Sequence, residues 1–169
     1  MRDPASRPFR ISPRIPGFDY ATAGAYFLTI CTRNMECRFG DVREGRMQLN
    51  EAGAMAADLW QRNVDRYCGV ELDALIVMPN HLHGILMIGT DPGCDPPSAT
   101  AYVQAFKSIT TIEYGRGVRD GRYPPYDTAL WQRSFHDRIL RTERDLDAAR
   151  IYIEGNPARW QERRDFPSS

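Results

Sequence analysis

The chain is organised around the stretch Met78-Pro79-Asn80-His81-Leu82-His83-Gly84-Ile85-Leu86-Met87-Ile88. The apolar run after Pro79-Asn80 is typical of a buried strand, and residues 70–78 are typical of another, so we expect the two to meet at a tight connection. Side chains alternate along a strand, so His81 and His83 share one face. Two imidazoles on one face can bind a metal ion, but His-x-His also occurs on half-exposed strands that bind nothing.

Three further segments favour β structure. Residues 26–32 are aromatic and β-branched at nearly every position, which predicts a central strand covered on both faces. Residues 38–49 indicate a hairpin that turns near Glu44-Gly45. Residues 130–141 alternate well enough to predict a final strand.

Two helices are predicted between these strands. Asn50 is a suitable N-cap for a helix over about residues 51–66, where apolar side chains keep helical spacing. Ser98 can cap a second helix, which Gly115 and Gly117 are expected to end.

The last predicted helix carries two polar side chains of interest. Thr142-Glu143-Arg144-Asp145 fits a capping box that opens this helix, and residues 155–157 are expected to stop it. Tyr152 and Asn156 are four residues apart and would lie next to each other on one face. Taken alone, Tyr152 could be an ordinary aromatic at the helix margin. Asn156 could be a C-terminal cap, since Pro157 disfavours helical geometry at the residue before it.

The order of elements predicts an α+β fold, a ferredoxin-like antiparallel sheet with helices packed mainly on one face. The length of 169 residues and the absence of repeats predict a single domain, residues 25–165, after an extended N-terminal arm rich in Pro and Arg, residues 1–24. No segment is apolar enough to span a membrane, so we expect a cytoplasmic protein without a membrane partner. The four cysteines form no Cys-x-x-Cys pair, and we expect free thiols rather than a disulfide.

Charge gives little information about partners. The formal net charge is zero, which provides no global electrostatic reason to bind nucleic acid. Arginine supplies all but one of the 22 positive charges. Guanidinium groups suit phosphate, although most charged surface runs are simply solvated.

Several segments, taken together and in this order, resemble the HUH single-tyrosine transposases, especially their REP-associated relatives. HUH denotes histidine, hydrophobic residue, histidine. The matching segments cover most of the chain: Tyr26-Phe27-Leu28-Thr29-Ile30-Cys31-Thr32, Met78-Pro79-Asn80-His81-Leu82-His83-Gly84, Phe106-Lys107-Ser108, Trp131-Gln132-Arg133-Ser134-Phe135-His136-Asp137-Arg138-Ile139-Leu140-Arg141, and Tyr152-Ile153 with Asn156-Pro157.

The resemblance implies a metal-dependent enzyme that cleaves and rejoins single-stranded or hairpin DNA during transposition. By this resemblance Tyr152 is the nucleophile that forms a 5′-phosphotyrosine link, and His81, His83 and Asn156 bind a divalent metal. The donor set of two nitrogens and one amide oxygen suits Mn²⁺ or Mg²⁺. A phenol with an ordinary pKa near 10 needs such a metal, because the phosphate must first be made electrophilic.

Four basic residues are candidate DNA contacts under this hypothesis, and two other functions remain open beside it. Lys107, Arg133, Arg138 and Arg141 are candidate contacts to DNA phosphates, with solvated or salt-bridged roles as the alternative. A domesticated protein that binds hairpin DNA without cutting it is an alternative function, as is a hydrolytic metal-dependent nuclease. The sequence leaves open whether the protein is a monomer or a homodimer, and whether the tyrosine serves its own histidines or those of a partner.

Overall fold

A hairpin of two largely apolar strands forms one half of the central sheet. The computed structural model describes residues 23–89 and 92–165. In it β4 spans Val70–Met78 and β5 spans His81–Ile88, and the two pair antiparallel across Pro79-Asn80, which confirms the prediction for this stretch. All eight residues of β5 are buried. The histidines therefore lie on a central strand.

The remaining elements complete a ferredoxin-like sheet with the strand order β4-β5-β1-β6. Every neighbouring pair of these strands is antiparallel. A β2–β3 hairpin is inserted after β1, and two short 3-10 helices lie at residues 33–35 and 64–66. The bounds of the other elements are β1 Gly24–Cys31, β2 Gly40–Arg43, β3 Arg46–Leu49, α1 Glu51–Asn63, α2 Ala99–Arg119, β6 His136–Leu140, α3 Glu143–Glu154 and α4 Asn156–Asp165.

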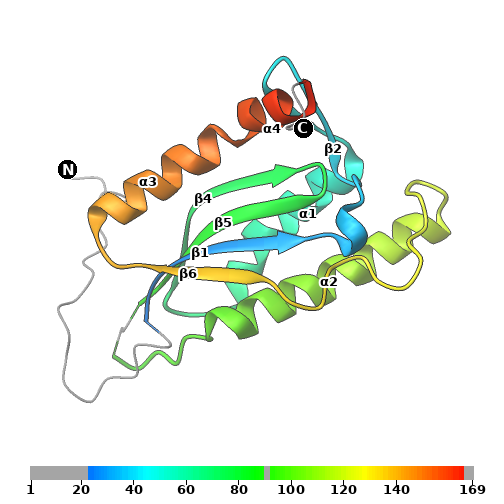
Figure 1. Ribbon diagram of the computed structural model, residues 1–169. Helices are drawn as coiled ribbons and strands as arrows, with labels where there is room; N and C mark the ends of the chain where they lie inside the picture. The colour runs from blue at the N-terminus through cyan, green and yellow to red at the C-terminus, as the bar shows by residue number, and fades with distance from the viewer. Residues whose placement is uncertain (1–22, 90–91, 166–169) are drawn as a thin grey trace, which may run out of the picture.

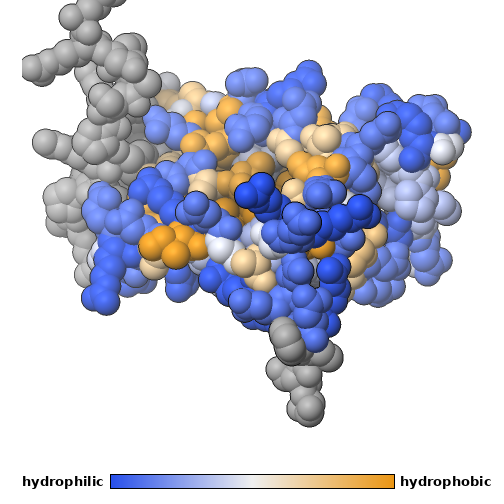
Figure 2. Space-filling view, turned by 90° about the horizontal axis from the view of Figure 1, so that it is seen from above, coloured by the Kyte–Doolittle hydropathy of each residue, from blue (hydrophilic) through white to orange (hydrophobic). Residues whose placement is uncertain are grey.

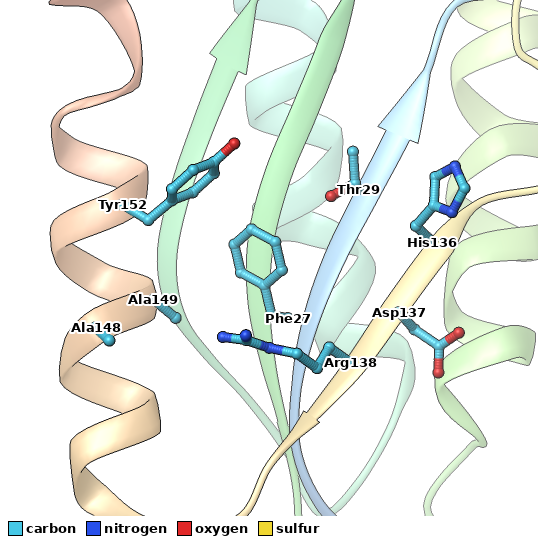
Figure 3. A pocket seen from close by; sticks show the side chains of 8 residues that line it. All are labelled: Phe27, Thr29, His136, Asp137, Arg138, Ala148, Ala149 and Tyr152. Atoms are coloured by element: carbon cyan, nitrogen blue, oxygen red, sulfur yellow. The ribbon is translucent and has the colours of Figure 1, made fainter. Parts of the chain in front are cut away.

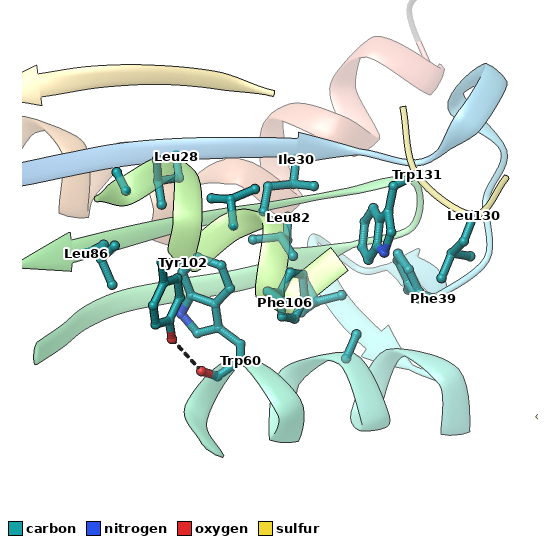
Figure 4. Close-up of a cluster of buried hydrophobic side chains, with 14 of the residues drawn as sticks. Leu28, Ile30, Phe39, Trp60, Leu82, Leu86, Tyr102, Phe106, Leu130 and Trp131 are labelled. Atoms are coloured by element: carbon teal, nitrogen blue, oxygen red, sulfur yellow. Dashed lines mark hydrogen bonds between the residues drawn. The ribbon is translucent and has the colours of Figure 1, made fainter. Parts of the chain in front are cut away.

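Helices cover both faces of the sheet (Figure 1). The prediction placed them mainly on one face, and the two helices inserted between the sheet strands, α1 and α2, do lie on one face. There Leu28 and Leu82 pack with Trp60 of α1 and Phe106 of α2. Figure 4 shows this cluster, in which the Tyr102 hydroxyl donates a 2.8 Å hydrogen bond to the Trp60 carbonyl.

α3 lies over the other face of the sheet, and its position there fixes the position of Tyr152. Leu146 and Ile153 are buried against side chains from the adjoining strands. Burial of such side chains contributes on the order of 1.5–3 kcal/mol each. The guanidinium of Arg150 holds both carboxylate oxygens of Asp73 on β4, at 2.9 and 2.5 Å. The predicted capping box is present at Thr142 and Asp145.

Two local expectations are wrong. α2 continues past Gly115 and Gly117 to Arg119. Gly117 has a packing role instead of a terminating one, since the Tyr123 ring would lie 2.2 Å from a Cβ added there. The final strand covers only residues 136–140 of the predicted 130–141. The prediction that residues 155–157 stop the helix after Thr142 is confirmed, since α3 ends at Glu154 with Gly155 as its cap, but it is not the last helix, because α4 begins at Asn156.

The expectation of free thiols is wrong for one pair. Cys68 and Cys94 form a disulfide, although 26 residues separate them. The loop before α2 passes directly over Gly69, where an added Cβ would lie 2.9 Å from the Cys94 sulfur. This close approach depends on the tertiary structure, so the spacing of the cysteines along the sequence could not predict the disulfide. Cys31 and Cys37 are free.

The predicted N-terminal arm lies almost entirely outside the described residues, and its last residue, Gly24, already belongs to β1. Among the helices that the structure describes, none combines the length and hydrophobicity required to cross a bilayer.

Candidate active site

The two histidines lie together on the face of β5 that α3 covers. Their ring centroids are 4.7 Å apart. Nδ1 of His81 is 2.7 Å from the Asn80 side-chain oxygen, and Nδ1 of His83 is 2.8 Å from the Thr29 hydroxyl. Hydrogen bonds of this kind fix the orientation of an imidazole and leave its Nε2 as the nitrogen that can bind a metal.

Both imidazoles are neutral at physiological pH. Burial lowers the pKa of His81 to about 4, an effect that the nearby positive charge of Arg163 strengthens and a hydrogen bond to Asn156 opposes. Burial likewise lowers the pKa of His83 to about 3, with smaller effects of the same sign from His81 and Arg159. Desolvation disfavours the protonated ring, and the neutral ring is the form that binds metals.

Tyr152 lies beside these histidines in the same chain. Its ring centroid is 5.4 Å from that of His83 and 5.8 Å from that of Phe27, in edge-on contacts. Tyr152 remains 40% exposed, so the residue is accessible from solvent. The Arg159 guanidinium lies 4.5 Å from the centroid of the Tyr152 ring and also donates a hydrogen bond to the Tyr152 carbonyl.

Asn156 reaches the same site from a different helix. α3 ends at Glu154, and Asn156 is the first residue of α4, so the two side chains do not share one helix face as expected. The Asn156 side chain is nevertheless buried, and it lies close enough to His81 to oppose the lowering of the pKa of that imidazole. The predicted proximity of Tyr152, Asn156 and the histidine pair is therefore present, although its local geometry differs.

α4 adds residues that the sequence analysis missed. The Trp160 ring lies 5.8 Å from that of His81, and the charges of Arg159 and Arg163 act on the histidines. Asn at a helix start followed by Pro in the first turn is a common N-terminal signature, so Asn156-Pro157 could have indicated a new helix directly after the stop.

The β2–β3 hairpin holds α4 in this place. The backbone N–H of Gly45, at the hairpin turn, donates a hydrogen bond to the Gln161 side chain. Arg164 forms an ion pair of 3.2 Å with Asp41 of β2. The insertion after β1 thus helps to position the helix that carries Asn156 and the site arginines.

The four basic residues expected at DNA lie in different environments. Lys107 donates hydrogen bonds to the carbonyls of residues 132, 133 and 134, at 2.9, 3.3 and 3.0 Å, and burial lowers its pKa. This arrangement uses the three donors of the ammonium to hold the loop before β6. Arg133 and Arg141 are exposed, and Arg138 is exposed at the rim of a pocket next to Tyr152.

This pocket separates α3 from β1 and β6 (Figure 3). Its volume is about 410 Å³, and its lining comprises Phe27, Thr29, His136, Asp137, Arg138, Ala148, Ala149 and Tyr152. Tyr152 belongs both to this pocket and to the group around the histidines. The candidate active site therefore continues into a cavity along α3.

The donors around His81 fit a hard divalent cation with open coordination positions. Two neutral imidazoles and one side-chain amide are the protein groups near this position that have metal-binding atoms. Across residues 23–89 and 92–165, no three His, Cys, Asp or Glu side chains cluster in a way that could hold a metal. A site without a carboxylate leaves most of the charge of a Mg²⁺ or Mn²⁺ ion to be balanced by a bound phosphate.

Comparison with solved structures identifies the fold. A REP-associated tyrosine transposase bound to a REP hairpin matches with a TM-score of 0.61 and 19% identity, over 89% of this chain and 74% of that one. A presumed transposase from Deinococcus radiodurans matches with a TM-score of 0.52 and 21% identity, over 85% of this chain and 96% of that one. The chain therefore shares the fold of these two proteins.

The sequence relationship is with a protein of unknown activity. An uncharacterised protein of Haemophilus influenzae is 31% identical over 163 residues, which cover 90% of this chain and 91% of that protein. The chain belongs to the same family as this Haemophilus protein. No family model matches the sequence.

Proposed function

We propose that the protein is a metal-dependent transposase that cleaves and rejoins single-stranded DNA through Tyr152. The observation that carries the proposal is the position of the Tyr152 ring, 5.4 Å from His83 within one chain. A solvent-accessible tyrosine next to two neutral, oriented imidazoles is the arrangement that attack on a phosphodiester needs. The fold shared with a REP-associated tyrosine transposase supports the same reaction class.

His81, His83 and Asn156 would hold the divalent metal, Mg²⁺ or Mn²⁺. When bound, such an ion neutralises charge on the phosphate and makes the phosphorus more electrophilic. Asn80 and Thr29 orient the two imidazoles. The cost of burial keeps both rings unprotonated, so no proton needs to be displaced before they bind the ion at neutral pH.

Tyr152 carries out the covalent step. Its hydroxyl oxygen attacks phosphorus, the new O–P bond replaces the bond to the 3′ oxygen, and the phenol proton is lost while the departing 3′ oxygen gains one. Arg159 packs over the Tyr152 ring and helps to hold it in place through a cation–π contact. One phosphodiester replaces another, so a second 3′-OH can reverse the step and join a new strand without ATP.

Single-stranded or hairpin DNA is the proposed partner. One structural neighbour was solved with a REP hairpin. Viewed from the α3–α4 side, strongly hydrophilic side chains alternate with small hydrophobic areas (Figure 2), a mixture that suits a ligand with both phosphates and bases. The histidines and the tyrosine lie in one chain, so we propose that a monomer carries out cleavage.

The test is formation of a covalent adduct. The full chain is incubated with an end-labelled hairpin strand and Mn²⁺, and the products are separated on a denaturing SDS gel. We expect an SDS-stable adduct with the unmodified protein and with Tyr67→Phe, a control on the opposite side of the sheet that packs against Tyr102. Tyr152→Phe, His83→Ala and added chelator should each abolish the adduct.

Two other results would contradict this proposal, and each would support a different function. Cleavage that persists in Tyr152→Phe but fails in His83→Ala would identify a nuclease that uses activated water. Hairpin binding that is unaffected by chelator, with no cleavage under Mn²⁺ or Mg²⁺, would identify a binding protein without catalytic activity.

A further inference from the structure

The pocket beside Tyr152 is not used by the cleavage chemistry described above. It has a volume of about 410 Å³, within the range of roughly 300–1,000 Å³ typical of small-ligand sites. One wall is the exposed Ala148 and the buried Ala149 on α3, and the opposite wall is Phe27 on β1. Phe27 also stacks on His83, with ring centroids 5.2 Å apart, so the pocket directly adjoins the metal-ligand candidates.

The polar groups of the pocket come from the pairing of β1 with β6. Phe27 pairs with Arg138, and Thr29 pairs with His136, which places all four side chains on the α3 face. Asp137 pairs with Leu28, and its carboxylate points away from α3 in Figure 3, whereas the Arg138 guanidinium points toward the helix. The pocket thus has an aromatic wall, Phe27, and a wall of small apolar side chains, Ala148 and Ala149, together with a hydroxyl, an imidazole and a cation.

These features fit a flat heteroaromatic ring attached to a phosphate. Aromatic walls stack against a base without selecting its sequence, and Arg and Thr side chains are common donors to phosphates and base edges. Tyr152 borders both the pocket and the histidine pair. A phosphate at the Tyr152 hydroxyl therefore leaves the attached nucleotide within reach of the space between Phe27 and Ala148.

We propose that this pocket binds the unpaired base of a nucleotide that flanks the scissile phosphate. The inference rests on the proposed function, because it names a subsite of that reaction. A base must leave its helical stack to enter a pocket on the protein. Insertion of the base would therefore make the enzyme select DNA that is unpaired at the cleavage point.

The experiment fills the pocket and removes the base, separately and together. Ala148→Leu adds three carbons at an exposed, helix-compatible position and leaves every metal-ligand candidate unchanged. Ala101→Leu makes the same change on an exposed position of α2, across the sheet, and serves as the control. Each protein receives intact strands and strands with a stable abasic analogue at either nucleotide next to the cleavage point.

At one flanking position, we expect the abasic analogue to slow adduct formation by the unmodified protein and by Ala101→Leu roughly 5- to 150-fold, the range for loss of one stacked base. Ala148→Leu should cleave intact DNA slowly, because the added side chain occupies the space for the base. It should cleave the abasic strand no more slowly than the intact one, because the base makes no contact in a filled pocket and its removal loses nothing. The inference is overturned if neither abasic position matters to the unmodified protein, or if Ala148→Leu remains as sensitive as Ala101→Leu.

A binding measurement separates this inference from the cleavage proposal. Strands that carry 2-aminopurine at each flanking position are titrated with Tyr152→Phe, so no covalent step is needed. Quenching at one position that disappears in Tyr152→Phe/Ala148→Leu, and persists in Tyr152→Phe/Ala101→Leu, supports base insertion even if no adduct ever forms. Adduct formation by the unmodified protein without such quenching would leave the cleavage proposal intact and overturn the pocket assignment.

Discussion

Gly84, the residue after the histidine pair, should not accept a side chain. A Cβ added there would lie 2.7, 3.1 and 3.4 Å from three atoms of the Trp60 indole. Trp60 is fully buried, and its ring is enclosed by Tyr102 and Phe106 at centroid distances of 5.2 and 5.1 Å. The ring cannot move aside without disturbing both neighbours.

We expect Gly84→Ala to destabilise the protein. Inserting a carbon into a closely packed core costs about 1–3 kcal/mol, and the reduced freedom of the unfolded chain returns only about 0.4–1 kcal/mol. Gly89→Ala is the matched control, because its added Cβ would meet its nearest atom at 3.6 Å, an ordinary contact. Urea unfolding followed by circular dichroism measures both, and only Gly84→Ala should lower the midpoint.

A second substitution identifies the cause. Trp60→Phe removes atoms of the larger indole ring that the new methyl group would meet, so Gly84→Ala should cost less in that background. Trp60 Nε1 has no hydrogen-bond partner, so this replacement breaks no polar contact. An equal penalty in both backgrounds, or equal midpoints for Gly84→Ala and Gly89→Ala, would refute the explanation by overlap with Trp60.

Three further outcomes follow from the site. The free energy of unfolding should fall as pH drops below about 6.5, because the unfolded chain then binds protons that His81 and His83, with pKa values of about 4 and 3, do not accept when folded. At pH 5 the loss is at most about 2 kcal/mol per histidine, and an unchanged thermal unfolding midpoint between pH 7 and pH 5 would contradict this prediction. Mn²⁺ should bind about tenfold or more tightly when single-stranded DNA is present, because within the described part of the chain no carboxylate clusters with the two histidines and a phosphate must balance the charge of the ion. If this is wrong, paramagnetic resonance of free Mn²⁺, with Tyr152→Phe to prevent cleavage, would show equal affinities with and without DNA. Mixing Tyr152→Phe chains with His83→Ala chains should restore no adduct, and restored labelling on a gel would show that active sites are shared between chains.

The sequence predicts the parts of the site that depend on local pattern. Strand alternation places His81 and His83 on one face, and an apolar run with a two-residue connection defines their hairpin. The capping box at Thr142 locates the start of α3, and helical spacing from there places Tyr152 at the helix margin. These features need only neighbours close in sequence.

The parts that depend on tertiary contact are not predictable from one sequence. α3 stops at Glu154 as predicted, but the second helix that starts at Asn156 packs on the β2–β3 hairpin through contacts with residues far away in the sequence. Gly117 gives the Tyr123 ring room to pack against α2, and this contact cannot be read from the sequence. The Cys68–Cys94 bond and the pocket along α3 likewise require the assembled sheet.

The lone lysine also affects how covalent complexes of this protein are interpreted. Natural abasic sites carry an aldehyde that captures proteins through lysine amines as Schiff bases. Lys107 is the only lysine in the sequence, and its ammonium is already bound by three backbone carbonyls. All other basic side chains except the histidines are guanidinium groups, which do not react in this way. Side-chain imine formation is thus confined to a single amine in this chain, and covalent capture of DNA at any other residue reports on its other nucleophiles.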